Sequence, residues 1–283
     1  MRLLSWNIQW CRGVDGKVDP VRIAQTARAL CDPDILCLQE VAVNFPALAG
    51  SSGEDQVAAL ASQFPGFSAT VAWGVDLPDD AGGRRRFGNL ILSRFPVGRV
   101  LRHALPWPPD PGTPSMPRVA LEAEIRAPRG PVRVTTTHLE YYAARQRAAQ
   151  VERLRALHIE ACAHADAARS PREGGGPLHH QPRPRAAILT GDFNLPADDP
   201  LHERLCAPFD DATPRLHDAW HLVHPNTAHA PSFRLYDPTY AGTPYCCDFV
   251  FVSDDLAPRL KTLRIDAQCQ ASDHQPVIVE FSA

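Results

Sequence analysis

The sequence predicts an α/β protein in which two β-sheets pack face to face, with helices on their outer faces. Most of its apolar runs are short and rich in β-branched residues, as buried strands are. Only a few stretches have the spacing of an amphipathic helix, and no internal repeat is present. The 28 prolines, about twice the usual share, punctuate long connections. Two packed sheets flanked by helices use all of these elements.

Composition narrows the class of protein. At 283 residues the chain approaches the upper size of one hydrophobic core, and we expect a single domain over residues 1–283. The formal charge of -3 and pI of about 6.4 give no overall positive charge that would attract nucleic acid or an anionic membrane. A local basic patch is still compatible with this net charge. No run reaches the ~18 apolar residues of a membrane span, and the N-terminus becomes polar too early for a signal peptide. We therefore expect a cytoplasmic protein.

The eight cysteines include no C-x-x-C pair, so they predict neither a zinc site nor a disulfide framework.

The chain opens with a β-α-β unit. Residues Arg2–Asn7 alternate as a strand, Asp19 caps a helix that runs through Leu30, and Pro33–Glu40 forms a second buried strand. A parallel pair with a right-handed crossover is expected. Asn7 and Glu40 then lie at the same edge of one sheet.

The later elements are expected in the following order. Up to residue 139 they are a helix over 53–64, a strand over 67–73, an exposed loop over 79–86, a strand and turn over 88–96, a strand over 97–105, a Pro-rich loop over 106–117, a half-exposed strand over 118–125 and its hairpin partner over 132–139. Beyond it they are a helix over 143–165, a flexible surface loop over 169–185, a buried strand from 188, a short helix over 198–206, an irregular polar region over 210–245, and strands over 248–253, 260–266 and within 272–281.

The strand from Ile188 ends in the strongest chemical signal of the chain. Gly191 breaks it, and Asp192 and Asn194 leave its end two residues apart, where alternation points both side chains the same way. A carboxylate and a carboxamide at a strand end suit an oxygen-loving cation or a water to be activated. The same residue types are also ordinary in turns, so other parts of the chain must decide.

Eight polar residues share this position at the start or end of an apolar run. Taken singly they are ordinary turn residues, but together they include four carboxylates and two imidazoles. Burying such charges costs several kcal/mol apiece unless a cation or hydrogen bonds compensate. A shared rim therefore favours a metal site. The eight are Asn7, Glu40, His138, Asp192, Asn194, Asp248, Asp273 and His274.

In this order the motifs resemble the endonuclease/exonuclease/phosphatase superfamily, which includes DNase I-like nucleases. The resemblance implies a four-layered sandwich of two mixed sheets flanked by helices. It covers nearly the whole chain, and it rests on Ser5-Trp6-Asn7, Ile35-Leu36-Cys37-Leu38-Gln39-Glu40, Gly88 to Pro96, Thr137-His138-Leu139, Gly191-Asp192-Phe193-Asn194, Asp248-Phe249-Val250-Phe251 and Ser272-Asp273-His274.

The resemblance also implies a divalent cofactor, Mg2+ with Mn2+ as an alternative. Glu40 would bind it, with Asn7 and Asp273 close by. Carboxylate and amide oxygens with retained waters suit such a hard ion.

The catalytic roles follow the same resemblance. Asp192 would orient or deprotonate the attacking water, and Asn194 would hold that water or a phosphate oxygen. His274 would donate a hydrogen bond to the scissile phosphate, with Asp248 fixing its tautomer. The resemblance further matches His138 and Arg118 to residues that contact phosphate. Water then attacks phosphorus in line, without a covalent enzyme intermediate.

The expected function is hydrolysis of a phosphodiester in DNA, RNA or a nucleotide. A phospholipid or phosphomonoester hydrolase of the same fold is the alternative, and a silent phosphate-binding module is a third possibility that the complete set of acids and imidazoles disfavours. An apurinic endonuclease is disfavoured because His138 stands where that group has a tyrosine, and Pro244-Tyr245-Cys246-Cys247 precedes Asp248. No protein partner is evident, and a monomer is expected.

Other motifs carry weaker hypotheses. The serine of Ser272-Asp273-His274 is disfavoured as a nucleophile, because no G-x-S-x-G elbow is present. A metal cluster at His217, His221, His224 and His229 is considered, although surface histidines are commoner. Four segments could set specificity or be solvated surface. They are Gly82 to Arg86, Pro106 to Met116, Tyr141-Tyr142 with Arg145, Gln146 and Arg147, and Phe233 to Tyr245.

Overall fold

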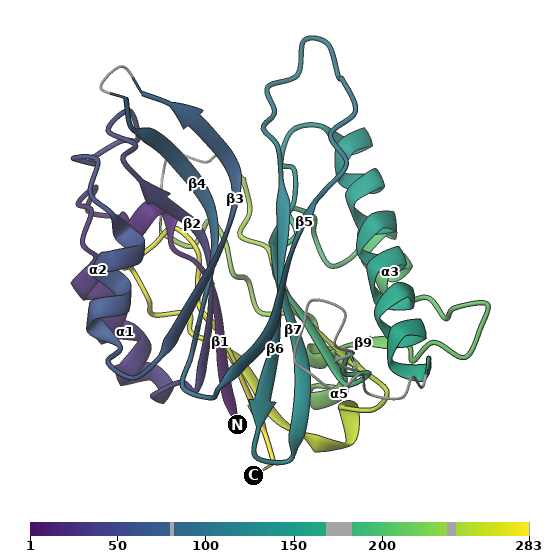
Figure 1. The fold of residues 1–283 in the computed structure, drawn as a ribbon. Coiled ribbons are helices and arrows are strands. Elements are labelled where there is room, and N and C mark those ends of the chain that lie inside the picture. Colours follow the sequence, from purple (N-terminus) through teal and green to yellow (C-terminus); the bar gives the residue numbers. More distant parts are fainter. Residues whose placement is uncertain (80–81, 168–182, 237–241, 283) are drawn as a thin grey trace, which may run out of the picture.

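Two six-stranded β-sheets pack face to face, and helices cover their outer sides (Figure 1). The computed structural model describes residues 1–79, 82–167, 183–236 and 242–282. Helices α1 (Pro20–Cys31) and α2 (Gln56–Gln63) lie outside the first sheet, and the long helix α3 (Ala144–Asp166) lies outside the second. The four-layered sandwich implied by the resemblance is confirmed.

The first sheet has the strand order β11-β12-β1-β2-β4-β3. Its β1 and β2 are parallel, and its other neighbouring strands are antiparallel. The β-α-β unit expected at the start of the chain is therefore confirmed. The strands are β1 (Arg2–Asn7), β2 (Ile35–Val43), β3 (Ser68–Pro78), β4 (Arg84–Ser93), β11 (Leu260–Ile265) and β12 (Val277–Phe281).

The second sheet has the order β5-β6-β7-β8-β10-β9, with one parallel pair, β7 and β8. Helices α4 (Pro200–Cys206) and α5 (Ala219–Val223) accompany it, and short 3-10 turns occur at Gln9–Cys11 and Ala257–Arg259. The strands are β5 (Val97–Ala104), β6 (Val119–Ala127), β7 (Gly130–His138), β8 (Ala187–Asp192), β9 (Leu216–Asp218) and β10 (Asp248–Ser253).

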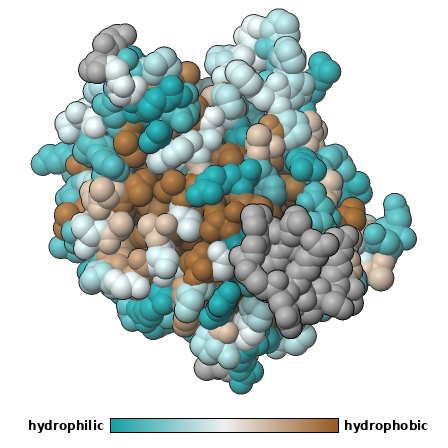
Figure 2. Space-filling model, viewed as in Figure 1, coloured by the Kyte–Doolittle hydropathy of each residue, from teal (hydrophilic) through white to brown (hydrophobic). Residues whose placement is uncertain are grey.

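Apolar side chains fill three layers. Ile35 and Cys37 of β2 face the second sheet, whereas Leu36 and Leu38 face α1. Because both faces of the central strands are buried, these strands read as continuous apolar runs rather than alternating ones. Hydrophobic side chains also gather across the middle of one broad face, over the edge strands β3 and β5 (Figure 2).

Three sequence expectations are wrong. Residues 84–86 are not an exposed loop, since they pair with β3 as the start of β4. Over residues 119–123, strand β6 is buried on both faces rather than half-exposed, and its polar face carries Glu122, which pairs with buried Arg133 and Arg183. The region 210–245 is not wholly irregular, since it contains β9 and α5. Of the expected loop over 169–185, residues 169–182 lie outside the described residues, and Arg183 is buried.

Across the described ranges, no helix is both long enough and apolar enough to cross a membrane.

Candidate active site

The parallel strand pairs of the two sheets end at the same place. Asn7 ends β1 beside Gln39 of β2, and His138 ends β7 beside Asp192 of β8. The carboxyl ends of parallel strands are where sites collect in α/β proteins. A pocket of about 260 Å3 opens there. Seven predicted site residues line it, namely Glu40, Arg118, His138, Asp192, Asn194, Asp273 and His274.

Glu40 reaches the pocket through a distortion of its strand. The sequence predicts that the strand ends at Glu40, but β2 continues to Val43, and its register with β4 shifts between Leu38 and Val41. Glu40 sits at this bulge with a left-handed φ of 60°. Bulges redirect a side chain out of the strand alternation, and a left-handed glutamate carries backbone strain of the kind that active sites store.

Asn7 lies between two carboxylates. Its Nδ2 donates to Glu40 Oε1 at 3.0 Å and to Asp192 Oδ2 at 2.9 Å. Its Oδ1 accepts the backbone N–H of Gln9 at 3.0 Å. In this orientation Asn7 therefore offers these carboxylates its nitrogen, while its oxygen is occupied by the backbone.

Asp273 is held by contacts with Gln9 and Ser272, neither of which the sequence analysis selected as a site residue. Gln9 Nε2 donates to Asp273 Oδ2 at 2.8 Å, and Ser272 Oγ lies 3.2 Å from Asp273 Oδ1. The same hydroxyl is 2.8 Å from the Asn7 carbonyl oxygen and accepts the His274 N–H. Ser272 is thus a structural hydroxyl, in agreement with its dismissal as a nucleophile.

Asp192 is the centre of the site. Besides Asn7, its Oδ2 lies 3.4 Å from His138 Nε2 and 3.7 Å from His274 Nε2. Its Oδ1 accepts the backbone N–H of Asn194 at 2.9 Å. Because β8 ends at Asp192, Asn194 lies beyond the alternation, with a left-handed φ of 52°. Asn194 nevertheless reaches the pocket, and its Nδ2 donates to the Leu139 carbonyl at 2.8 Å.

The two histidines have opposite environments. Burial alone lowers the pKa of His274, but the carboxylates of Asp248 and Asp192 outweigh it and hold that pKa well above the usual value. Burial and the charge of Arg118 together lower the pKa of His138 to about 3. His274 is therefore an imidazolium at neutral pH and His138 is a neutral imidazole. Such divergence is typical of groups with distinct catalytic tasks.

Asp248 fixes the ring of His274. Its Oδ2 is 2.8 Å from His274 Nδ1, and it also accepts the Ser232 hydroxyl at 2.6 Å. The Phe233 ring stacks on His274 with centroids 4.4 Å apart. Sequence reasoning missed Ser232, because it lies in an irregular segment whose polar residues resemble ordinary surface. It named Phe233 only as part of a possible specificity segment.

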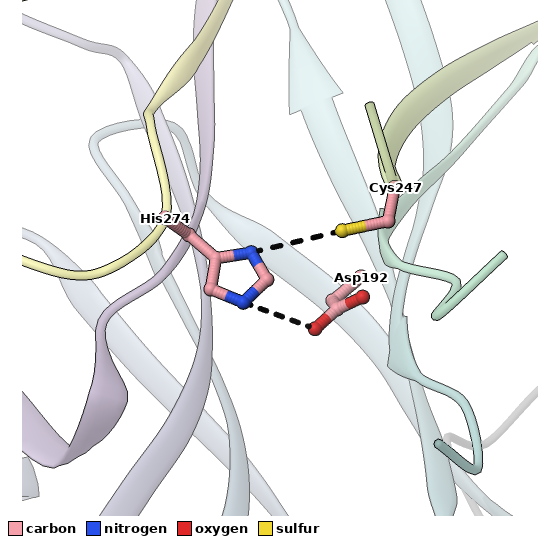
Figure 3. A group of neighbouring side chains, drawn as sticks. All are labelled: Asp192, Cys247 and His274. Atoms are coloured by element: carbon pink, nitrogen blue, oxygen red, sulfur yellow. Dashed lines mark hydrogen bonds and ion pairs between the residues drawn. The ribbon is translucent and has the colours of Figure 1, made fainter. Parts of the chain in front are cut away.

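Cys247 also lies beside His274. Figure 3 shows the imidazole between the Asp192 carboxylate and the Cys247 thiol, whose Sγ is 4.0 Å from Nδ1. Burial and the Asp248 charge raise the pKa of this thiol well above its usual value. Cys247 is therefore a neutral, apolar neighbour rather than a thiolate nucleophile.

Arg118 supplies positive charge at the pocket wall. Its Nε donates to buried Glu140 at 3.2 Å, while its Nη1 has no hydrogen-bond partner among the described residues. A buried unpaired guanidinium nitrogen has lost water without compensation, which an anionic ligand can supply.

The acids suit a divalent cation. Burial and the negative charge of Asp273 together raise the pKa of Glu40 to about 7. A hard cation relieves the unfavourable ionisation of a carboxylate that is buried beside another acid. One group of possible ligands also combines Glu40, His138 and Asp192. The residues present fit Mg2+ or a similar ion.

The segments proposed to set specificity contribute to the pocket only in part. Met116, Tyr141, Tyr142 and Phe233 from the proposed specificity segments line the pocket, whereas no residue of 82–86 does. Residues 237–241 lie outside the described part of the chain. Arg147 donates to the Glu140 and Tyr141 carbonyls and therefore supports the backbone.

The four histidines of the weaker metal hypothesis do not gather together. His217 binds Asp254 and His224 binds the Leu263 carbonyl, while His221 and His229 face Asp218.

A four-layered sandwich with carboxylates and two histidines at its parallel strand ends is the architecture of a class of phosphoric ester hydrolases. The model of the Endonuclease/Exonuclease/phosphatase family matches residues 4–274. The chain belongs to this family, whose members are phosphoric ester hydrolases that depend on divalent metals. The protein is therefore an enzyme of that class.

Solved structures agree with this assignment. An endonuclease/exonuclease/phosphatase from Beutenbergia cavernae DSM 12333 is 25% identical with a TM-score of 0.67, over 100% of this chain and 72% of that one. The mannosyl-6-phosphatase Bt3783 from Bacteroides thetaiotaomicron VPI-5482 is 18% identical with a TM-score of 0.67, covering 100% of both chains. The 3'-5' exonuclease NExo from Neisseria meningitidis is 21% identical with a TM-score of 0.63, also over 100% of both. A search among curated proteins finds no match.

Proposed function

We propose that the protein is a Mg2+-dependent phosphodiesterase that acts on nucleic acid or a nucleotide. The observation that carries this proposal is the position of Asp192. Its Oδ2 lies 2.9 Å from Asn7, 3.4 Å from neutral His138 and 3.7 Å from charged His274, at the pocket surface. A carboxylate so placed can accept a proton from water while the imidazolium faces the phosphate.

Asp192 serves as the base. Asn7 and the backbone of Asn194 each donate a hydrogen bond to it, one to each oxygen, so the carboxylate has a fixed orientation. Water held beside it loses a proton to Asp192 as it attacks phosphorus in line with the leaving oxygen.

His274 and Asp248 stabilise the phosphate. The Nδ1–H of His274 is engaged by Asp248, which leaves Nε2–H to donate to a phosphate oxygen. The positive ring counters the charge that grows on that oxygen as water attacks. His138, Arg118 and Asn194 contact the other phosphate oxygens, and the unpaired Nη1 of Arg118 is the donor that supports this.

Glu40 and Asp273, with Asn7 adjacent, would hold a divalent ion, which would supply further positive charge to counter that of the phosphate.

The pocket walls support a substrate with a flat or apolar group next to the phosphate. They are largely aromatic and aliphatic, and such side chains can stack on a nucleobase. These residues are Trp10, Phe45, Leu48, Val75, Phe87, Met116, Tyr141, Tyr142 and Phe233.

A phosphomonoesterase is the second candidate. The observation that favours it is the full-length likeness to a mannosyl-6-phosphatase at a TM-score of 0.67. The pocket of about 260 Å3 is also of a size that suits a small ligand. Phospholipid hydrolysis is tested by the substrate screen described below.

A substrate screen in Mg2+ or Mn2+ separates these functions. Bis-p-nitrophenyl phosphate, p-nitrophenyl phosphate, single- and double-stranded DNA, RNA and phospholipid vesicles are each assayed with wild type, Asp192→Asn and the exposed control Asp198→Asn. We expect diester and nucleic-acid hydrolysis by wild type and Asp198→Asn only. Turnover confined to p-nitrophenyl phosphate would establish the second candidate, and turnover by Asp192→Asn equal to wild type would refute the role of Asp192.

The cytoplasmic location, the monomeric state and the single-domain organisation expected from the sequence stay predictions.

A further inference from the structure

A second group of imidazoles surrounds a carboxylate on the outer side of the second sheet. Asp218 ends β9, His202 lies on α4, and His229 lies in the segment after α5. Asp218 Oδ2 is 2.9 Å from His202 Nε2 and 2.7 Å from His229 Nε2. A third histidine, His221 on α5, places its Nδ1 at 3.5 Å from the same oxygen.

The group is separate from the catalytic pocket, because none of its members lines it. Two successive residues of β10 face the two sites, one the catalytic pocket and the other the histidine group. Asp248 binds catalytic His274, whereas the Phe249 ring packs against His202 and His229 with centroids 4.7 and 5.3 Å apart. The opposite directions of neighbouring side chains on a strand explain this division.

Burial makes the arrangement unusual for surface histidines. The side chains of His202, Asp218 and His229 are 6%, 3% and 5% exposed, while that of His221 is 55% exposed. Burial alone raises the pKa of Asp218, but hydrogen bonds from His202 and His229 lower it below the usual value, so the carboxylate is ionised. A buried anion faces three imidazoles across one small volume.

The spacing matches what three imidazoles adopt around one ion. With Zn–N distances of ~2.0–2.1 Å and tetrahedral angles, the centroids of two ligating rings lie ~5 Å apart. The observed centroid separations are 5.7 Å for His202 and His229, 4.7 Å for His221 and His229, and 6.2 Å for His202 and His221. One ligand atom from each of His202, Asp218 and His229 lies within 4.8 Å of the others.

We propose that His202, Asp218 and His229 form a second metal site, for a transition-metal ion of the Zn2+ type, with His221 as fourth ligand. Three nitrogens and one oxygen select Zn2+, Co2+ or Ni2+ over Mg2+, which prefers oxygen ligands. The site is therefore chemically distinct from the oxygen-rich catalytic rim.

Binding requires only local movement. The two short contacts of Asp218, 2.9 and 2.7 Å, must open to the ~3.3 Å that separates two ligands of a tetrahedral zinc ion. The imidazole protons that make these contacts leave as the ion enters. His221 is already 3.5 Å away, and its exposed side chain can turn inward.

Such an ion anchors the segment that supports catalysis. His229 is three residues before Ser232, which donates to Asp248, and four before Phe233, which stacks on His274. Fixing His229 to α4 and β9 therefore restrains the backbone that positions both contacts. The site is structural, and the catalytic residues remain those of the pocket.

Metal titration of the full chain tests the site. The double variant Glu40→Gln, Asp192→Asn weakens ion binding at the catalytic rim and serves as background. After chelator treatment it is titrated with Co2+, whose visible absorption reports tetrahedral coordination, and then with Zn2+. We expect one equivalent of Co2+ with tetrahedral bands, displaced by Zn2+, and a Zn2+-dependent rise in melting temperature. Absence of binding would show that Asp218 is satisfied by the two imidazoles alone, and would overturn the proposal.

Single substitutions in this background locate the ion. His202→Gln and His229→Gln are expected to abolish the tetrahedral bands, and exposed His221→Gln to weaken Co2+ binding about tenfold while the protein stays folded. His217→Gln, on the same strand β9 but directed to Asp254, is the matched control and is expected to bind as the background does. Unchanged bands in all three cluster variants would refute the site. Because activity is not measured, this result is independent of the proposed phosphodiesterase function.

Discussion

The two sheets have the same pattern of strand pairing but deliver different chemistry. In each sheet the central pair of strands is parallel, and two antiparallel pairings lie on either side of it. The pair β1 and β2 of the first sheet therefore corresponds to the pair β8 and β7 of the second. At the end of its pair the first sheet presents Asn7 and Glu40, and the second presents Asp192 and His138. Backbone topology therefore decides where the groups meet. Under the proposed function, the first sheet would hold the cation, and the second would position water and phosphate.

The division predicts unequal losses when equivalent acids are neutralised. Asp192→Asn removes the proposed base of the second sheet, so we expect kcat to fall about 10^3-fold, with no recovery in excess Mg2+. Steady-state kinetics across a Mg2+ series, with circular dichroism to confirm folding, measure this effect. A loss below tenfold would assign the base elsewhere.

The residues just before the two functional strand ends also differ. Trp6 fills a helix-covered core layer in β1, whereas Gly191 in β8 has a φ of 138°, and an added Cβ there comes 1.9 Å from the Thr137 carbonyl oxygen. We expect Gly191→Ala to lower the free energy of unfolding by about 3 kcal/mol or more. Urea unfolding measures this change in the free energy of unfolding. An unchanged midpoint would show that β7 and β8 can move apart enough to accommodate the added methyl group.

The charge of His274 depends on the second sheet. Asp248→Asn removes the largest of the carboxylate contributions that outweigh burial, so the pKa of His274 should fall and less of the ring should be imidazolium at neutral pH. We expect a loss of about 10^2-fold in kcat, partly restored at lower pH where the ring regains its proton. NMR titration of the ring checks the pKa directly, and an unaltered His274 titration would contradict the pairing.

The smallest effect is expected in the first sheet. Glu40→Gln should raise the Mg2+ concentration for half-maximal activity about tenfold, because other oxygens remain. Since the pKa of Glu40 is raised to about 7, protons compete with the cation, and wild-type Mg2+ affinity should fall as pH falls from about 8 to about 6. Calorimetry at the two pH values measures this, and Glu40→Gln, which lacks the titrating group, should show less pH dependence. An equal dependence in both proteins would assign the titration to another group.

The location of the site follows from local signals. Asn7, His138, Asp192 and Asp248 each stand at the end or start of an apolar run, and a strand end is a property that a short sequence window can show. Once the strands are parallel, their carboxyl ends must share an edge. The family motifs then supplied the order in which these ends assemble.

Residues that act through distant contacts are invisible to the same reasoning. Ser232 and Gln9 reach Asp248 and Asp273 across 16 and 264 positions of the chain. The bulge at Glu40 likewise depends on how β2 registers with β4, which a single strand does not reveal. A pattern read along one strand places Glu40 at an end, whereas cross-strand pairing turns it into the pocket.

The sequence by itself determined two sheets, their flanking helices and the set of polar strand ends, because hydrophobic periodicity and turn residues are local. Only the tertiary structure decided that Asn7 presents its nitrogen to the carboxylates, and that one histidine is charged while the other is neutral. It also selected His202 and Asp218, rather than His217 and His224, as neighbours of His229. Orientation, burial and charge depend on groups brought together from distant positions, and those distances exist only in the folded chain.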